Sequence, residues 1–343
     1  MSNGRVRNME EFASLSGISR PTLSKYFNDP SSVRDSTRVR IEEALEQHEY
    51  RPNIYAMNQN RRLTKNIGIV VPYLTDPFFA EIARNIERLC IDAGFRTIIL
   101  GSHGESAQEN ANLESLLAIK PAGVLLAPLG RTSDRNALEA FAEEVPTILF
   151  DSNVERVGEA FFGTDSTQAL GMMVDYLSRT GEAPAFFEMR DAPNPNANKR
   201  RMSYLHAMEG LGAEPQVISV GGHGWDFEEI GRREGARLLR RGELRSNTVL
   251  CSNDRLAIGL LAAAYQSGLR VGKGDGHALR VAGIDGHPFS RYTCPTLTTV
   301  SQAYTSIAER SVKALLSLIE SGERVEQRET TLLDGTLILR DSA

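Results

Sequence analysis

The sequence predicts an α/β protein in which a small, all-helical N-terminal unit precedes a large body of two parallel sheets. Three observations support this prediction. The first fifty residues contain only helical patterns, a polar segment over 52–65 follows them, and from Asn66 onward apolar runs of strand length alternate with helical stretches. At 343 residues, with 41% hydrophobic and 24% charged residues, the chain is long enough to bury several cores.

Residues 1–51 show the pattern of three helices. Asn8 is a side-chain N-cap before two acids and a helical repeat of apolar residues, and Gly17 then supplies the positive φ that a tight turn needs. Ser19 begins a second helix, and a third is predicted over 35–49. Two helices joined by so short a turn form a helix-turn-helix.

The second helix has one apolar and one polar face. Leu23 and Phe27 lie four residues apart, so we expect both to point inward and the opposite face to meet the major groove of DNA. Arginine and lysine can donate to guanine N7 and O6, whereas hydroxyl groups suit phosphates. The outward residues are Arg20, Pro21, Thr22 and Lys25, and Thr22 and Ser24 suit phosphate contacts. A three-helix domain with a solvated charged face is the alternative.

The charge is divided unevenly along the chain. Residues 1–65 hold 11 Lys/Arg and 8 Asp/Glu, a net of +3, so the other 278 residues carry 28 minus 36, or −8, of the total of −5. A basic module for a polyanion joined to an acidic body fits this division, although chance unevenness gives it too. No apolar run reaches the ~18 residues of a membrane helix and no signal-peptide core is present, so we expect a cytoplasmic protein without a membrane partner.

Eight apolar runs in the body are predicted to be buried parallel strands, separated by helical stretches. Alternation of this kind indicates two doubly wound sheets, with a ligand cleft at the carboxyl ends of the strands. The predicted strands are 67–71, 97–100, 124–127, 147–150, 185–189, 217–220, 249–251 and 281–284, and the predicted helices include 78–93, 109–118, 169–179 and 256–267.

Polar and aromatic residues stand where several of these strands end. Fixed carboxylates and amides can bind hydroxyl groups, and an aromatic face can cover the C–H surface of a sugar ring, so the cleft is predicted to take a polyol. Helix capping and core packing are the alternatives for each residue taken singly. The strand-end residues are Phe78, Phe79, Asp151, Asn253, Asp254 and Asp285.

Signatures of catalysis and of cofactor binding are missing. The sequence has no GxxxxGK[ST], no GxGxxG after a strand, no GxSxG and no HExxH, so neither an enzyme nor a cofactor is expected. The Gly-rich segment 272–276 has the wrong spacing for a phosphate loop and is interpreted as a turn. Residues that a metal could use lack diagnostic spacing, so no metal site is expected. They are His277, Asp285 and His287, with the scattered Cys90, Cys251 and Cys294.

A specific pattern runs through the first fifty residues: Met9-Glu10-Glu11-Phe12-Ala13, Gly17-Ile18-Ser19, Thr22-Leu23-Ser24-Lys25, Asn28, Thr37-Arg38 and Tyr50-Arg51-Pro52-Asn53. It resembles the headpiece of the lactose and galactose repressor (LacI/GalR) family, which implies a homodimer on a palindromic operator in double-stranded DNA. The resemblance implies that Arg20, Pro21 and Lys25 stand at the positions that read base edges, where Pro21 can offer only apolar contact. It also implies a hinge over 52–65, in which Gln59 replaces a wedge leucine and offers a minor-groove hydrogen bond instead.

The body carries the family's pattern as well, at 67–72, 76–81, 252–254, 281–285 and 295–300. This resemblance implies a periplasmic-binding-protein-like core over 66–343, whose chain crosses between two lobes near Phe162, Ser301 and Thr330. The implied N-lobe is 66–162 with 301–329, and the implied C-lobe is 163–300 with 330–343. The implied effector contacts are Phe78, Phe79, Asp151, Arg200, Trp225, Asn253, Asp285, Gln302 and Tyr304, and Arg201 competes with Arg200 because Ser203 stands where the family has glycine.

The two resemblances together imply a sequence-specific transcriptional regulator, a repressor, whose operator affinity depends on a small carbohydrate or sugar alcohol bound between the lobes. An effector of the purine or phosphorylated-sugar class is one alternative. A transport-type sugar-binding protein without a DNA function is the other, and it would need an export signal in place of the headpiece.

Overall fold

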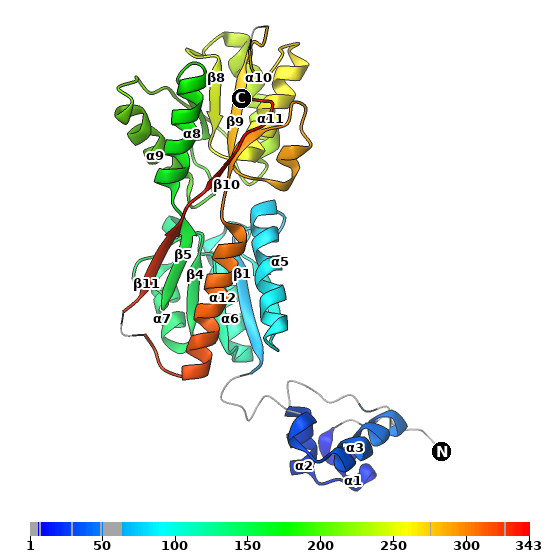
Figure 1. Cartoon of the computed structure of the whole chain (residues 1–343). Helices are drawn as coiled ribbons and strands as arrows, with labels where there is room; N and C mark the ends of the chain where they lie inside the picture. Colours follow the sequence, from blue (N-terminus) through cyan, green and yellow to red (C-terminus); the bar gives the residue numbers. More distant parts are fainter. Residues whose placement is uncertain are drawn as a thin grey trace. The chain divides into compact units, whose positions relative to one another are not determined.

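The structure, a computed structural model, describes residues 6, 8–28, 30–48, 50, 64–274, 276–325 and 327–343. The chain forms two compact units, Met1–Thr64 and Lys65–Ala343 (Figure 1), and each is described by itself. Most of the predicted hinge, including Gln59, lies outside the described residues.

The described residues of the first unit form a headpiece of three α-helices. It consists of α1 (Met9–Ser16), α2 (Arg20–Asn28), the short 3-10 helix η1 (Pro30–Ser32) and α3 (Asp35–His48). Asn8 caps α1 by accepting a hydrogen bond from the Glu11 amide at 2.9 Å, and Gly17 ends the helix with φ of 64°, as the sequence predicts. The core of the unit is built on Phe12, Leu23 and Ile41, which are fully buried.

The second unit begins with a lobe, the N-lobe, built on a six-stranded parallel sheet in the order β11-β5-β4-β3-β1-β2. Helices α5 and α12 pack on one face, and α6 and α7 on the other (Figure 1). In β1, Ile69 and Val71 pack on the side of α5 and α12, and Val70 packs on the side of α6 and α7. The strand is therefore apolar on both faces. The strands are β1 (Asn66–Val71), β2 (Arg96–Gly101), β3 (Gly123–Leu126), β4 (Thr147–Phe150), β5 (Ala160–Thr164) and β11 (Glu329–Leu333); the helices are α5 (Pro77–Asp92), α6 (Ser106–Ile119), η2 (Gly130–Thr132), α7 (Arg135–Glu144) and α12 (Tyr304–Ser321).

The second lobe, the C-lobe, repeats this plan in the order β12-β10-β9-β8-β6-β7, with β12 antiparallel to β10. Helices α8 and α9 cover one face, and α10 and α11 the other. The strands are β6 (Ala185–Met189), β7 (Val217–Val220), β8 (Thr248–Cys251), β9 (Arg280–Asp285), β10 (Thr298–Ser301) and β12 (Thr336–Ile338); the helices are α8 (Ser166–Thr180), α9 (Ala197–Gly210), α10 (Phe227–Arg241), α11 (Asp254–Gln266) and η3 (Pro288–Arg291).

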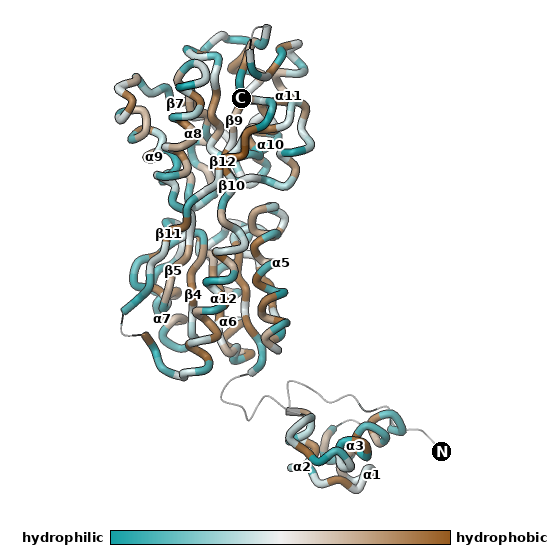
Figure 2. The backbone as a smooth tube through the Cα atoms, in the orientation of Figure 1, coloured by the Kyte–Doolittle hydropathy of each residue, from teal (hydrophilic) through white to brown (hydrophobic). Residues whose placement is uncertain are grey.

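All eight predicted strands are present, as β1 to β4 and β6 to β9, and the predicted α/β class is confirmed. Figure 2 shows the apolar residues along these strands, inside the lobes. Strands β5, β10, β11 and β12 were not predicted. No helix among the residues described combines the length and the apolar character that a bilayer span requires.

Three links carry the chain between the lobes: from β5 to α8, from β10 to α12 and from β11 to β12. The last link differs from the expectation near Thr330, because 329–333 pairs in parallel with β5 and the crossing follows at Asp334 and Gly335. The carboxyl ends of β1 and β4 and of β8 and β9 lead into the residues of one shared cleft.

Candidate functional site

The outward face of the headpiece is the side of α2 that the sequence predicts. Arg20, Pro21 and Lys25 are exposed, and Thr22 and Ser24 are half-buried. Leu23 is fully buried and Phe27 packs against the same core, which fixes the direction of the other side chains. The Ser19 hydroxyl lies 2.8 Å from the Thr22 hydroxyl at the helix start, and Arg20 donates from Nη1 to Glu10 Oε1 at 3.1 Å.

The interlobe cleft brings together nearly all of the effector residues expected from the sequence. Eight of the nine line one cavity: Phe78, Phe79, Asp151, Arg200, Trp225, Asn253, Asp285 and Gln302. The ninth, Tyr304, lies beside them, with its ring 5.2 Å from that of Phe78 and its hydroxyl donating to the Asp285 carbonyl. The cavity measures about 20 Å³, so the lobes are closed upon each other.

Asp285, at the carboxyl end of β9, organises the C-lobe side of the cleft. Its Oδ1 accepts from Arg200 Nη2 and, at 2.7 Å, from Gln302 Nε2. Arg200 also donates from Nη1 to the Ser252 carbonyl at 2.7 Å. Burial acts to lower the pKa of Arg200, but Asp285 and the neighbouring carboxyls outweigh it and raise this pKa, so the guanidinium stays charged. Arg201, the competing assignment, instead pairs with Glu188 at 3.2 Å and is not among the residues that line this cavity.

Asp151, at the carboxyl end of β4, supplies the carboxyl group of the N-lobe side. It accepts from Asn196 Nδ2 of the C-lobe at 2.9 Å, and the same amide reaches the Asp151 carbonyl at 3.1 Å. Burial raises the pKa of Asp151 to about 7, although Arg200 and Lys199 oppose the shift. Asp151 and Asp285 both have positive φ, 61° and 129°, a conformation that costs energy in non-glycine residues and often occurs at functional sites.

A second polar contact joins the lobes, besides that of Asp151 with Asn196. Arg255 of α11 donates from Nη1 to Asp76 Oδ2 at 3.0 Å, while its Nε and Nη2 bind Glu228 at 2.8 and 2.7 Å. Asp76 also caps α5 by accepting from the Phe78 amide at 3.0 Å. Burial raises the pKa of Asp76, helped by Asp285 and opposed by Arg255.

Aromatic rings close the cleft between these polar contacts. Trp225 stacks on Tyr73 of the N-lobe with ring centroids 5.1 Å apart and an interplanar angle of 3°, and Phe79 lies edge-on to it at 6.2 Å. The indole Nε1 is buried, and within the described part of the chain it has no hydrogen-bond acceptor. Trp225 is the single tryptophan in the sequence, so its fluorescence reports on this cleft alone.

Two of the strand-end residues, Asn253 and Asp254, have structural roles, which the sequence analysis gave as the alternative to effector binding. Asn253 caps α11 by accepting from the Leu256 amide at 2.8 Å, although it also lines the cavity. Asp254 is fully buried, where it binds Thr299 Oγ1 at 2.6 Å and the His287 amide at 2.7 Å. Burial, with Asp285 nearby, raises the pKa of Asp254 to about 7.

The sequence reasoning missed five residues that line or close the cleft. Asp76 stands inside the motif that places Phe78, and Arg255 directly follows the Asn253-Asp254 pair, so both had a local signal. The others lie in or beside loops of irregular sequence. The missed residues are Asp76, Asn194, Asn196, Phe227 and Arg255.

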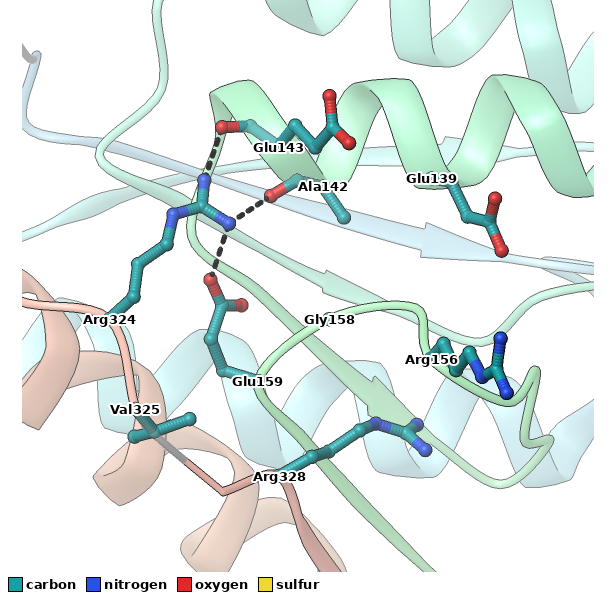
Figure 3. Close-up of a pocket in the computed structure, with 9 residues that line it drawn as sticks. All are labelled: Glu139, Ala142, Glu143, Arg156, Gly158, Glu159, Arg324, Val325 and Arg328. Carbon is teal, nitrogen blue, oxygen red and sulfur yellow. Dashed lines mark hydrogen bonds and ion pairs between the residues drawn. The ribbon is translucent and has the colours of Figure 1, made fainter.

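Two larger hollows lie outside this cavity. One of about 530 Å³ lies beside it, between η2 and the segment 188–201, and shares Asn194 with its lining. The other, of about 460 Å³, lies at the amino end of β5 (Figure 3). There Arg324 donates to the Ala142 carbonyl at 2.8 Å and to the Glu143 carbonyl, and it pairs with Glu159 at 3.2 Å. The arginine thus satisfies carbonyl groups in the last turn of α7.

Metal-ligand geometry is missing from the residues described, where no three His, Cys, Asp or Glu side chains form a group that could hold an ion. The segment around Gly272 forms a turn, as predicted, with Val271 bridged to Leu279. Asp275 of that segment lies outside the described residues.

Comparison with known proteins identifies both units. The family model for bacterial regulatory proteins of the lacI family matches residues 8–53, and that for the periplasmic-binding-protein-like domain matches 174–343. The ribose operon repressor of Escherichia coli (strain K12) is 26% identical over 321 residues, 93% of this chain and 95% of the repressor. The transcriptional repressor CytR of the same strain is 27% identical over 341 residues, 97% and 95% of the two chains.

Among solved structures, the Lac repressor dimer bound to operator and the anti-inducer ONPF has a TM-score of 0.82 to this chain, with 23% identity over 98% of both. That similarity shows the fold. One family model falls on each of the two units, and the repressors align over nearly the full length of the chain. The chain therefore joins a headpiece that matches the lacI family of bacterial regulatory proteins to a periplasmic-binding-protein-like core, and it is similar over nearly its full length to bacterial transcriptional repressors.

Proposed function

We propose that the protein is a cytoplasmic repressor that binds a palindromic operator as a homodimer. Its operator affinity falls or rises when a small carbohydrate binds in the interlobe cleft. One observation carries the proposal: a single chain joins an outward, basic recognition helix to a cleft whose walls come from both lobes. A recognition helix covers one half-site, which is why a second copy is needed. No enzymatic step is proposed.

The chemistry of the cleft favours a neutral sugar or sugar alcohol. Its lining holds three carboxyl groups, Asp76, Asp151 and Asp285, and two guanidinium groups, Arg200 and Arg255. Both arginines of this lining are already paired with acids, which disfavours the binding of a phosphate ester. The carboxyl and amide oxygens can accept from hydroxyl groups, and the aromatic rings can cover C–H surface.

A purine is the less favoured effector, because the rings of Phe78 and Phe79 meet at 79° and leave no parallel slot for a flat base. The ribose operon repressor among the relatives supports a pentose as the first ligand to test. Differences between these chains are large, so hexoses and alditols belong in the same screen.

Opening and closing of the lobes is the conformational change through which an effector would alter operator affinity. A cavity of about 20 Å³ has room for about one water molecule, so a pentose requires the lobes to separate or the lining to rearrange. Two interlobe contacts, Asp76 with Arg255 and Asp151 with Asn196, oppose separation. An effector that favours one lobe arrangement by ~1 to 3 kcal/mol would change operator affinity ~5- to 150-fold.

The test is selection of bound DNA from a random pool by the full chain, with and without a panel of pentoses, hexoses, alditols, phosphorylated sugars and purines. We expect a palindromic site whose recovery one neutral sugar changes, and the same sugar should alter Trp225 fluorescence. Binding of purines or phosphate esters alone would overturn the effector class. Failure to enrich any site would overturn DNA recognition, and an exported sugar-binding protein would then be the better interpretation.

A further inference from the structure

An acidic residue stands beside the predicted base-reading arginine of the headpiece. Glu10, in the first turn of α1, accepts from Arg20 Nη1 at 3.1 Å, although the two residues are ten positions apart. Both side chains are exposed, Arg20 at 60% and Glu10 at 77%. The contact therefore lies on the surface of the headpiece, at the first residue of the recognition helix.

Stability does not account well for this pair. An exposed ion pair contributes little to stability because solvent screens it, and a carboxylate beside a DNA-binding surface repels phosphates. A cation in the first turn of a helix is also disfavoured by the helix dipole, and Arg20 begins α2. An arginine at this position is thus unfavourable for the helix itself, which favours a role in recognition over one in stability.

We propose that Glu10 is a positioning residue for base recognition, which holds the Arg20 guanidinium in the orientation that reads one base pair. The inference rests on the proposed DNA-binding function and adds a specificity determinant to it. Arginine has five N–H donors in a planar fork, and Glu10 engages Nη1. The Nε and Nη2 edge stays available for a bidentate contact with guanine O6 and N7.

Two effects on DNA binding follow from this geometry. An oriented guanidinium loses less side-chain freedom when it meets the correct base, so discrimination at that base pair rises. The carboxylate meanwhile weakens phosphate contacts that do not depend on sequence. Glu10 thus lowers non-specific affinity and sharpens preference at the position read by Arg20.

The experiment uses the full chain and the selected operator, with competitor duplexes substituted at each base pair. Arg20→Ala first identifies the base pair whose preference it erases. Glu10→Ala should then reduce discrimination at that same pair roughly tenfold, because an unheld guanidinium makes the bidentate contact less often, and should raise affinity for random duplex a few-fold. Glu10→Gln, which keeps an acceptor, should retain part of the discrimination.

Glu43→Ala is the matched control, because Glu43 is an exposed acid of α3 that forms no ion pair with α2 within the headpiece residues described. It should leave discrimination unchanged. In the Arg20→Ala background, Glu10→Ala should have no further effect on base preference. A Glu10→Ala profile equal to that of Glu43→Ala would overturn the inference, as would a changed preference at another base pair that persists without Arg20. If the unmodified chain selects no site, the proposed function itself fails.

Discussion

Asp76 of the N-lobe and Arg255 of the C-lobe form an ion pair across the cleft, with Arg255 Nη1 3.0 Å from Asp76 Oδ2. Glu228 holds the other edge of the same guanidinium, so Arg255 is already oriented before it meets Asp76. Asp76 in turn caps α5 at the point where Phe78 enters the cleft. The contact thus ties the helix that carries the aromatic wall to the opposite lobe.

Asp76→Asn should shift the protein toward open lobes. Asparagine keeps the capping oxygen but removes the charge, so the interlobe hydrogen bond loses about 1.5 to 3 kcal/mol. We expect the Trp225 emission to move to longer wavelength as the indole meets water. Asp134→Asn, the same change at the N-cap of α7 and without an interlobe contact, is the control. Identical spectra for the two variants would contradict a role for Asp76 in closure.

Asp151 should make the protein less stable as pH rises. Its pKa is near 3.8 when unfolded and about 7 when folded, so the folded state holds an extra proton between these values. Unfolding free energy then falls by about 2 kcal/mol between pH 5 and pH 7 on account of this group. The window closes above the folded pKa, where both states are ionised.

Asp151→Asn mimics the protonated carboxyl, keeps an acceptor for Asn196 and tolerates positive φ. Denaturant titrations at pH 5, 6 and 7 should show a flatter pH dependence for this variant than for the unmodified protein. His287, whose pKa burial lowers, acts in the opposite direction in both proteins and cancels in the comparison. Parallel curves would show that Asp151 is ionised in the folded state.

Arg200→Lys should impair effector binding and leave operator recognition in place. Lysine cannot bridge the Ser252 carbonyl and the Asp285 carboxylate with one planar group, so Asp285 loses its fixed orientation. We expect the effector Kd, measured by Trp225 fluorescence, to rise at least about tenfold, equivalent to about 1.4 kcal/mol. Arg201→Lys, one residue along the chain, should bind the effector normally. Loss of binding in both variants would assign the effect to α9 as a whole.

Gly259→Ala should destabilise the C-lobe. A Cβ there would lie 2.2 Å from the Glu228 carbonyl oxygen and 2.6 Å from the Arg232 amide, both backbone atoms of α10. The helices would have to separate, at a cost of about 1 to 3 kcal/mol or more in unfolding free energy. Gly171→Ala in α8 has open space around it and should stabilise by about 0.5 to 1 kcal/mol. Chemical denaturation measures the unfolding free energy of both variants. An unchanged value for Gly259→Ala would mean that α10 and α11 can move apart at little cost.

The sequence predicted those parts of the fold that depend on local pattern. Buried parallel strands are continuous apolar runs. The residue after such a strand lies at the carboxyl end of the sheet, whatever the order of the strands. That is why Asp151 and Asp285 could be assigned to one cleft, and their contact with an effector stays a prediction. Leu23 and Phe27 were predictable for the same reason, since helical spacing alone sets the buried face.

The parts that depend on distant pairing were not predictable. Arg255 and Asp76 are 179 residues apart, and nothing in either local pattern shows that they meet. β11 has a mostly exposed pattern and becomes part of the N-lobe sheet only by pairing with β5, which is far from it in the sequence. Likewise, Glu10 has the pattern of a first-turn acid, and its contact with Arg20 follows from how α1 packs on α2.

The last strand of the N-lobe sheet has a consequence for how the protein is made. β5 is complete at Thr164, but its neighbour β11 ends at Leu333, about 170 residues later. At ~5 to 20 residues per second, a ribosome needs roughly ten to thirty seconds to supply it. For most of that interval, until α12 has been made, the face that α12 later covers, including Leu125 and Ile148, is open to water and to other nascent chains. We expect the newly made N-lobe to depend on chaperones until α12 and β11 have emerged.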